Sequence, residues 1–226
     1  MIFDLIRNGF SIDIILNLFA RVFVMFCVLP VHEFAHALVA TKLGDQTARL
    51  SGRLTLNPLA HLDFFGALLM IVAGFGYAKP VPVNMNNFKK RKPYMALTAA
   101  AGPLSNLIVA FIFSLLYCAV YRFGTVTQGS AAQIAATFFM YVVSINVSLA
   151  VFNFIPVPPL DGSRILTAVL PDRYYYKIMQ YERYIVYAVF ALIIFGALDT
   201  PMAVVSTAIM RLLFKIAALP FGLTIG

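Results

Sequence analysis

The apolar stretch from Ile12 to Leu43 constrains this chain most, because it is long and apolar enough to cross a membrane and yet contains His32, Glu33 and His36. An ionisable group inside a membrane is costly, at roughly 2.5–3.5 kcal/mol for a central charge on insertion scales, and therefore marks a functional site. The cluster also uses two of only three histidines in the chain. We expect the functional site to lie on this helix, inside the membrane.

The cluster has the His-Glu-x-x-His spacing of a zinc site. Residues four apart share one face of an α-helix, so His32 and His36 can bind one zinc ion together. Glu33 lies beside that face, where its carboxylate can accept a proton from water at the metal. The alternative is a pair of histidines that bond only within the protein, without a metal.

The composition predicts an integral membrane protein with an all-α polytopic fold. Of the 226 residues, 62% are hydrophobic and only 12% are charged, and the mean hydropathy is +0.88. Soluble domains contain about 25% charged residues. We expect five to six transmembrane helices, from spans at about 12–43, 94–121, 132–154, 183–198 and 201–219 and a shorter apolar run at 64–75.

Two features predict irregular structure between the first two long spans. Polar and apolar residues alternate from Thr47 to Leu56, which is typical of a β-strand, here at the membrane surface. Glycines and prolines from Gly74 to Asn84 exclude a continuous helix, and irregular backbone at membrane depth must be buried in protein or line a wet cavity. We therefore expect residues 62–88 to form a re-entrant hairpin or loop beside the metal site. The alternative is a short span over 62–76 followed by an ordinary loop.

The basic residues predict the orientation in the membrane. The net charge is +8, and if residues 62–88 re-enter, fourteen of the 17 Lys and Arg residues lie on one side. By the positive-inside rule this side is cytosolic, and His36 lies nearer to it than to the other. The run Lys89–Lys92 then anchors the protein to lipid and does not bind nucleic acid. We expect the lipid bilayer of the cell membrane as the surrounding partner.

A third metal ligand is expected after the span that ends near Phe154, where a proline-rich break leads to Asp161. A zinc site with two histidines needs a third protein ligand, and this span ends on the same face of the membrane as the first. Asp161 can instead cap a short helix over 162–170. In that case His61 and Asp63 are the next candidates.

Asn106 is a polar residue in the otherwise apolar span at 94–121. It follows the small residues Ala99–Gly102, which permit close contact with another helix, such as the one that carries the histidines. An amide at this depth needs a partner, so Asn106 either bonds between helices, grips a substrate or orients the site.

Five motifs cover about residues 30–165, and they are His32–His36, Gly52–Pro58, Lys79–Asn84, Ala101–Asn106 and Asn153–Gly162. In their order they resemble the site-2 protease family of intramembrane zinc metalloproteases, peptidase family M50. The resemblance implies one zinc ion per chain, bound by His32, His36 and Asp161, with Glu33 as the general base. It also implies that Asn106 and Asn153 bind substrate or stabilise the reacting carbonyl.

The resemblance further implies the compact branch of the family, without a PDZ or CBS domain. We expect a single membrane metalloprotease domain over residues 1–226, with a catalytic core at about 12–165 and accessory helices at about 172–226.

The expected function is that of an intramembrane zinc endopeptidase that hydrolyses peptide bonds in or near transmembrane segments of other membrane proteins. A transmembrane helix hides its own amides, so a substrate must unwind. It can then add as a strand to an extended edge segment, for which we expect Lys79, Pro80, Val81, Pro82, Val83 and Asn84. Alternatives are a zinc membrane protease of another family, such as one that trims lipidated tails, a catalytically silent zinc-binding protein that retains or escorts client helices, and a transporter. The sequence leaves the substrate's identity and the oligomeric state open.

Overall fold

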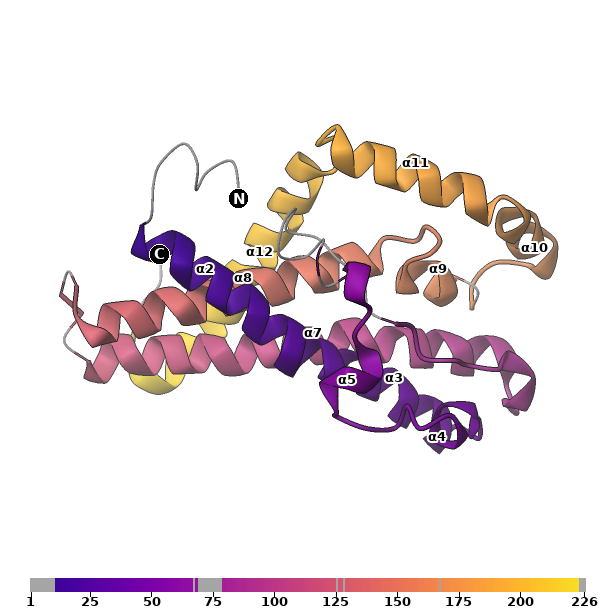
Figure 1. Cartoon of the computed structure of the whole chain (residues 1–226), viewed down its shortest axis with the longest axis horizontal. Coiled ribbons are helices and arrows are strands. Elements are labelled where there is room, and N and C mark those ends of the chain that lie inside the picture. The colour runs from indigo at the N-terminus through magenta and orange to yellow at the C-terminus, as the bar shows by residue number, and fades with distance from the viewer. Residues whose placement is uncertain are drawn as a thin grey trace.

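The computed structural model describes residues 11–66, 68, 79–124, 126–127, 129–166 and 168–223, and the regular elements in these residues are helical. Helices α7 (Arg91–Phe123) and α8 (Ala131–Phe154) lie side by side along the long axis of the molecule (Figure 1). The first long helix crosses them and consists of α2 (Ile12–Phe23), the π-helical turn Val24–Val28 and α3 (Leu29–Lys42). The described residues also form α4 (Thr47–Leu50), α5 (Pro58–His61), a 3-10 turn (Met85–Asn87), α9 (Asp161–Leu166), α10 (Asp172–Gln180), α11 (Glu182–Ile194), α12 (Asp199–Ala218) and a second 3-10 turn (Leu219–Phe221).

Four helices in the described part of the chain are long and apolar enough to cross a membrane, and they are Ile12–Lys42, Arg91–Phe123, Ala131–Phe154 and Asp199–Phe221. The all-α polytopic class is thereby confirmed, although the described residues hold fewer spans than the five to six expected. The expected span at 183–198 forms α11 instead, which has 13 residues. At 1.5 Å per residue such a helix reaches about 20 Å, short of the roughly 30 Å of a hydrocarbon core. Most of the apolar run at 64–75 lies outside the described residues, so the re-entry of 62–88 stays a prediction.

The expected strand over Thr47–Leu56 is wrong. Thr47–Leu50 is the short helix α4, and helical hydrogen bonds run from Leu50 N–H to the Gln46 carbonyl at 2.9 Å and from Ser51 N–H to the Thr47 carbonyl at 3.0 Å. Alternation predicts a strand only where one face is buried, and here Leu50 is 85% exposed. The apolar positions of the pattern therefore do not form one buried face, since Ala48 is buried and Leu50 and Leu56 are exposed, and local hydrogen bonds form a short helix instead.

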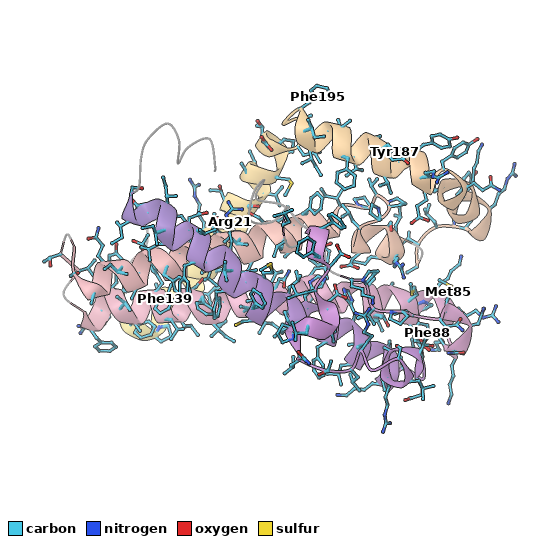
Figure 2. All side chains as sticks on the ribbon, viewed as in Figure 1. Arg21, Met85, Phe88, Phe139, Tyr187 and Phe195 are labelled. Atoms are coloured by element: carbon cyan, nitrogen blue, oxygen red, sulfur yellow. The ribbon has the colours of Figure 1, made fainter. Side chains whose placement is uncertain are left out.

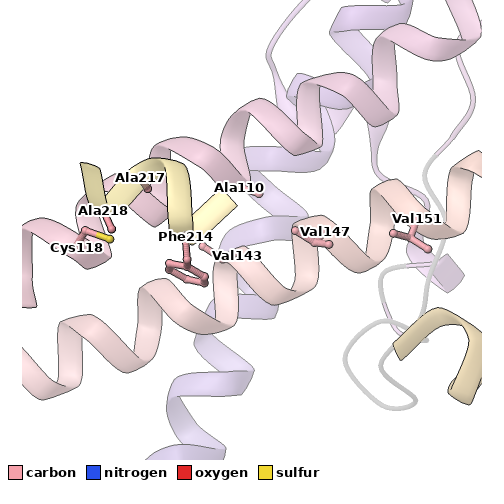
Figure 3. Close-up of a cluster of buried hydrophobic side chains, with 8 residues drawn as sticks. All are labelled: Ala110, Cys118, Val143, Val147, Val151, Phe214, Ala217 and Ala218. Carbon is pink, nitrogen blue, oxygen red and sulfur yellow. The ribbon is translucent and has the colours of Figure 1, made fainter. Parts of the chain in front are cut away.

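A buried cluster forms where α12 packs across α7 and α8 (Figure 3). Its small members let the helix backbones approach closely, which is how helices associate in a membrane. The cluster consists of Ala110, Cys118, Val143, Val147, Val151, Phe214, Ala217 and Ala218. A second cluster joins the first long helix to α8 through Ala20, Val24, Val28 and Val142. These contacts hold the helix that carries the His-Glu-x-x-His motif in place.

Candidate metal centre

Three predicted metal ligands come together in the fold. The Nε2 atoms of His32 and His36 are 3.1 Å apart, and Asp161 Oδ2 lies 3.4 Å from His32 Nε2 and 3.3 Å from His36 Nε2. In a tetrahedral zinc site with bonds of about 2.0–2.1 Å, ligand atoms are roughly 3.3 Å from one another. The triangle in this protein therefore has the dimensions of one face of a zinc tetrahedron, and one corner remains for water or substrate.

The surroundings of His36 fix the tautomer that a metal requires. Its Nδ1 lies 2.7 Å from the backbone carbonyl of Thr98, so Nδ1–H donates to that oxygen. The Nε2 lone pair then points towards His32 and Asp161. A hydrogen bond from the second ring nitrogen to a carbonyl is the usual support of a metal-binding histidine. The residues present thus fit a zinc ion, and Thr98 supplies a contact that no side-chain pattern could reveal, because it is made by the backbone.

Asp161 reaches the histidines because the proline-rich break turns the chain sharply between α8 and α9. Gly162 makes this turn possible, since a Cβ atom there would lie 2.4 Å from the carbonyl oxygens of both Phe154 and Ile155. Asp161 is the first residue of α9, and its carboxylate is directed at the two histidines. Asp161 is thus the first residue of the helix itself, which runs over Asp161–Leu166 where a helix over 162–170 was the alternative, and its contacts are those expected of a ligand.

Helix α7 passes close to the two histidines at Gly102. A Cβ atom on Gly102 would lie 2.3 Å from His36 Nε2 and 2.6 Å from His32 Nε2, closer than nonbonded atoms can approach. The small residues of this span therefore bring α7 against the motif helix. Gly102 leaves open the space in front of the Nε2 atoms that a metal ion would occupy.

Glu33 and the predicted edge segment Lys79–Asn84 are neighbours. The Val81 backbone N–H donates to Glu33 Oε2 at 3.2 Å, and Glu33 is only 8% exposed. The segment has no helix or strand assignment until the 3-10 turn at Met85. It therefore passes beside the general-base candidate without forming a helix, and substrate pairing stays a prediction.

The two predicted substrate-binding asparagines differ in their surroundings. Asn106 is 1% exposed, and neither its side-chain oxygen nor its nitrogen has a hydrogen-bond partner among the described residues. Asn153 is half-buried, and its Nδ2 donates to the Leu149 carbonyl on the preceding turn of α8. Within the described residues, no hydrogen bond joins either amide to His32, His36 or Asp161. The polar atoms of Asn106 are thus buried without a partner among the described residues, whereas Asn153 is tied to its own helix by one N–H, and substrate binding by either stays a prediction.

Asn146 is a further buried amide, which the sequence did not single out as a candidate. It is fully buried, its Nδ2 donates to the Val142 carbonyl, and its Oδ1 has no partner in the described part of the chain. The feature that singled out Asn106, an amide in an apolar span, is present at Asn146 too.

His61 and Asp63, the alternative candidates for the third metal ligand, are engaged with other groups. His61 Nε2 contacts the Thr55 carbonyl at 2.8 Å, and Asp63 accepts a hydrogen bond from Gly66 N–H.

A cavity of about 550 Å³ between α7 and α8 includes Tyr117, Tyr121, Gln133 and Tyr141 in its lining. None of the predicted site residues lines it, so we assign it no part in the chemistry of the metal centre.

Comparison with known proteins identifies the family. A sequence model of peptidase family M50 matches residues 118–197. The chain is 46% identical over 153 residues to a Bacillus subtilis protein named "Putative zinc metalloprotease YwhC", a match that covers 68% of this chain and 70% of the relative. This chain belongs to peptidase family M50. The resemblance seen in the five motifs is thereby confirmed.

More distant M50 relatives carry similar names. The chain is 29% identical over 153 residues to "Putative zinc metalloprotease Rip2" of Mycobacterium tuberculosis, covering 64% of this chain and 56% of the relative. It is 29% identical over 135 residues to "Putative zinc metalloprotease MJ0611" of Methanocaldococcus jannaschii, covering 60% and 62%. No solved structure matches the chain. Membership in this family supports a protease function and zinc as the metal, and together with the four apolar helices it indicates an integral membrane protein.

Proposed function

We propose that this M50 protein is an intramembrane zinc endopeptidase that hydrolyses peptide bonds in or near transmembrane segments of other membrane proteins. The observation that carries the proposal is the convergence of three ligand atoms within 3.1–3.4 Å of one another: His32 and His36 lie on a helix long enough to cross a membrane, and Asp161 joins them from α9. Glu33 sits one residue from the first histidine, where a general base is needed.

The chemistry is divided between the metal and the side chains. Zinc, when bound, supplies a Lewis acid for the peptide carbonyl and lowers the pKa of water towards neutrality. His32, His36 and Asp161 hold it, and the Thr98 carbonyl orients one of the histidines. Glu33 accepts a proton from the attacking water on its carboxylate and returns it to the leaving nitrogen, so the amine departs neutral. Asn106, with its unpartnered amide, can donate to the carbonyl oxygen as charge develops there.

The proposed site lies nearer the cytosolic face. His36 is six residues from Lys42 at the end of α3, a distance of about 9 Å along the helix. Lys42 and the run Lys89–Lys92 mark this end as the positively charged one, which the positive-inside rule assigns to the cytosol. Water therefore has a short path to the site, and a substrate helix has to unwind and pair with the segment Lys79–Asn84 to expose its amides.

The decisive test replaces Glu33 by glutamine in the purified, detergent-solubilised protein. We expect cleavage of a model transmembrane substrate to fall by a factor of roughly 10²–10⁴, the contribution of a general base. Zinc content is expected to stay at about one ion per chain, because Glu33 is not a ligand. Cleavage is followed by mass spectrometry of the products, and zinc by elemental analysis.

Glu182→Gln is the matched control, since Glu182 is the only other glutamate in the sequence and lies exposed at the start of α11. It is expected to cleave as the unmodified protein does. If Glu33→Gln cleaved equally well, Glu33 would not be the base. If the unmodified, zinc-loaded protein cleaved no transmembrane substrate, a catalytically silent zinc protein that escorts client helices would replace this proposal.

A further inference from the structure

Asp45 is a fully buried carboxylate outside the metal centre. It lies just beyond α3, and its own N–H donates to the Ala40 carbonyl at 2.9 Å, which fixes it to the end of the motif helix. Its Oδ1 accepts hydrogen bonds from Thr47 N–H at 3.1 Å and Thr47 Oγ1 at 2.5 Å. These bonds stabilise the turn into α4.

The same carboxylate also reaches far along the chain. Asp45 Oδ1 accepts a bond from Asn87 Nδ2 at 2.7 Å, and Oδ2 accepts one from the Asn84 backbone N–H at 2.7 Å. Burial alone would raise the pKa of the Asp45 carboxyl, but the hydrogen bonds from Thr47, Asn87 and Asn84 outweigh it and hold the pKa below its usual range. The group is therefore ionised, and bonds to a charged acceptor are the stronger kind.

Asn84 is the last residue of the edge segment, which has further anchors along its length. Lys79 N–H donates to the His61 carbonyl at 2.8 Å, and the Lys79 carbonyl accepts a bond from Arg53 at 3.3 Å. Val81 N–H donates to Glu33. The segment is thus held at its start by the connection after α4, at its middle by Glu33 and at its end by Asp45.

The prolines make this segment one-sided. In an extended chain the N–H groups of alternate residues point to the same side, so Lys79 and Val81 direct theirs towards the protein. Pro80 and Pro82, which alternate with them, have no N–H to offer on the other side. A proline-bearing outer edge resists pairing with another strand. The N–H of Val81 faces Glu33. A substrate strand that pairs with this segment therefore has to do so on the side of Glu33, and the position of the segment relative to the motif helix decides whether the substrate fits there.

Apolar packing supports the same arrangement. Phe88, which follows the edge segment, is 4% exposed and packs with Ala40 of α3 and Met95 of α7, and Met85 borders this cluster. Met85 and Phe88 lie at the end of the molecule that holds α4 (Figure 2). The hydrogen bonds of Asp45 and this apolar cluster therefore hold the same short stretch, Asn84–Phe88.

We propose that Asp45 is a positioning residue of the protease: it clamps the end of the edge segment to the motif helix, so that Val81 N–H and the donor-bearing edge stand beside Glu33 where a substrate strand binds. The inference rests on the proposed function for its catalytic meaning. Its structural content, that one carboxylate sets the position of residues 79–88, is independent of proteolysis.

The test uses Asp45→Asn in the full, zinc-loaded chain. An asparagine places an N–H₂ group against a set of donors, so at least one of the clamping bonds is lost. Hydrogen exchange measured by mass spectrometry is expected to be roughly tenfold to a hundredfold faster in the peptide covering 79–88, the range for losing a bond to a charged group. KM for a transmembrane substrate is expected to rise about tenfold with a smaller change in kcat, and zinc content is expected to stay unchanged.

A side-chain swap separates a clamp from a general loss of stability. In the double variant Asp45→Asn, Asn87→Asp, the amide introduced at position 45 donates its N–H₂ to the carboxylate introduced at position 87 and still accepts from Asn84 N–H. Slow exchange at 79–88 and the low KM are expected to return in part. Asp63→Asn is the matched control, because Asp63 also lies between α3 and α7 but accepts its hydrogen bond from the nearby Gly66. It is expected to leave exchange at 79–88 unchanged.

The outcomes against the proposal are specific. Unchanged exchange at 79–88 in Asp45→Asn overturns the clamp, and so does a swap that restores nothing. A fall in kcat at constant KM, or loss of zinc, overturns the positioning role. If Asp45→Asn does not fold, Asn87→Ala decides, since it removes the side-chain bond to Asp45 and is expected to speed exchange at 79–88. If the unmodified protein cleaves nothing, the exchange and swap results still judge the clamp while the proposed function falls.

Discussion

Replacing Asp161 by alanine is expected to remove zinc from the protein and to abolish cleavage. The Asp161 carboxylate supplies one of the three ligand atoms, 3.4 and 3.3 Å from the two histidine Nε2 atoms. Two histidines alone do not make the three-ligand site that a catalytic zinc needs. Losing a partner that only orients a ligand already costs about 10–100-fold in metal affinity, and losing a ligand costs more. Elemental analysis is expected to fall from about one zinc per chain to nearly none.

Asp199→Ala is the control for this experiment, because Asp199 is an exposed carboxylate at the start of α12, away from the two histidines in the sequence and unconnected to them by any ion pair among the described residues. It is expected to keep zinc and activity. Full zinc content in Asp161→Ala would contradict the three-ligand site. His61 and Asp63 would then be tested, although both are engaged with other groups in the fold.

Gly102→Ala is expected to have an effect of similar size although it replaces no ligand. The added Cβ would meet His36 Nε2 at 2.3 Å and His32 Nε2 at 2.6 Å. His36 cannot easily retreat, because its Nδ1 is bonded to Thr98 on the same helix as Gly102. Alanine is about 1 kcal/mol better than glycine inside a helix, so helix propensity alone favours the variant. Loss of zinc and of cleavage in a protein that remains helical would therefore report the collision at the metal site.

The comparison variant is Leu104→Ala on the same helix, where Leu104 is 49% exposed. Zinc content, helicity by circular dichroism and substrate cleavage are measured for both variants. A Gly102→Ala protein with normal zinc and normal cleavage would mean that α7 can move away from the histidines. The close approach of the two helices would then not be needed for function.

The grouping of the candidate metal ligands was predictable because general rules of helix geometry and zinc coordination apply to them. Helical spacing places His32 and His36 on one face, and the ligand count of zinc asks for a third group such as Asp161. Asp45 was not predictable in this way. A Gly-Asp pair after a helix is typical of any turn, and its partners Asn84 and Asn87 lie about forty residues further on.

The errors of the fold prediction have a related cause. The alternation over Thr47–Leu56 predicted a strand, but period-two patterns carry information only when a core lies on one side, and this stretch is largely exposed. The stretch 183–198 was apolar enough for a span, but its helix ends at Ile194 after 13 residues, because the chain turns at Gly196 with a left-handed φ of 68°. Composition therefore shows that a stretch is apolar enough for lipid, but it does not show where the helix in that stretch ends.

The π-helical turn at Val24–Val28 bears on where the histidines point. Its wider winding is marked by Leu29 N–H donating to the Val24 carbonyl, five residues back. The buried positions Ala20, Val24, Val28, His32, His36 and Ala40 recur every four residues. In a regular α-helix each step of four advances roughly 40° around the axis, so a stripe of this length would wind through about half a turn. The wide π-helical turn cancels part of that rotation. The direction around the helix axis in which His32 and His36 point therefore depends on the apolar segment before them, where α2 packs against α8.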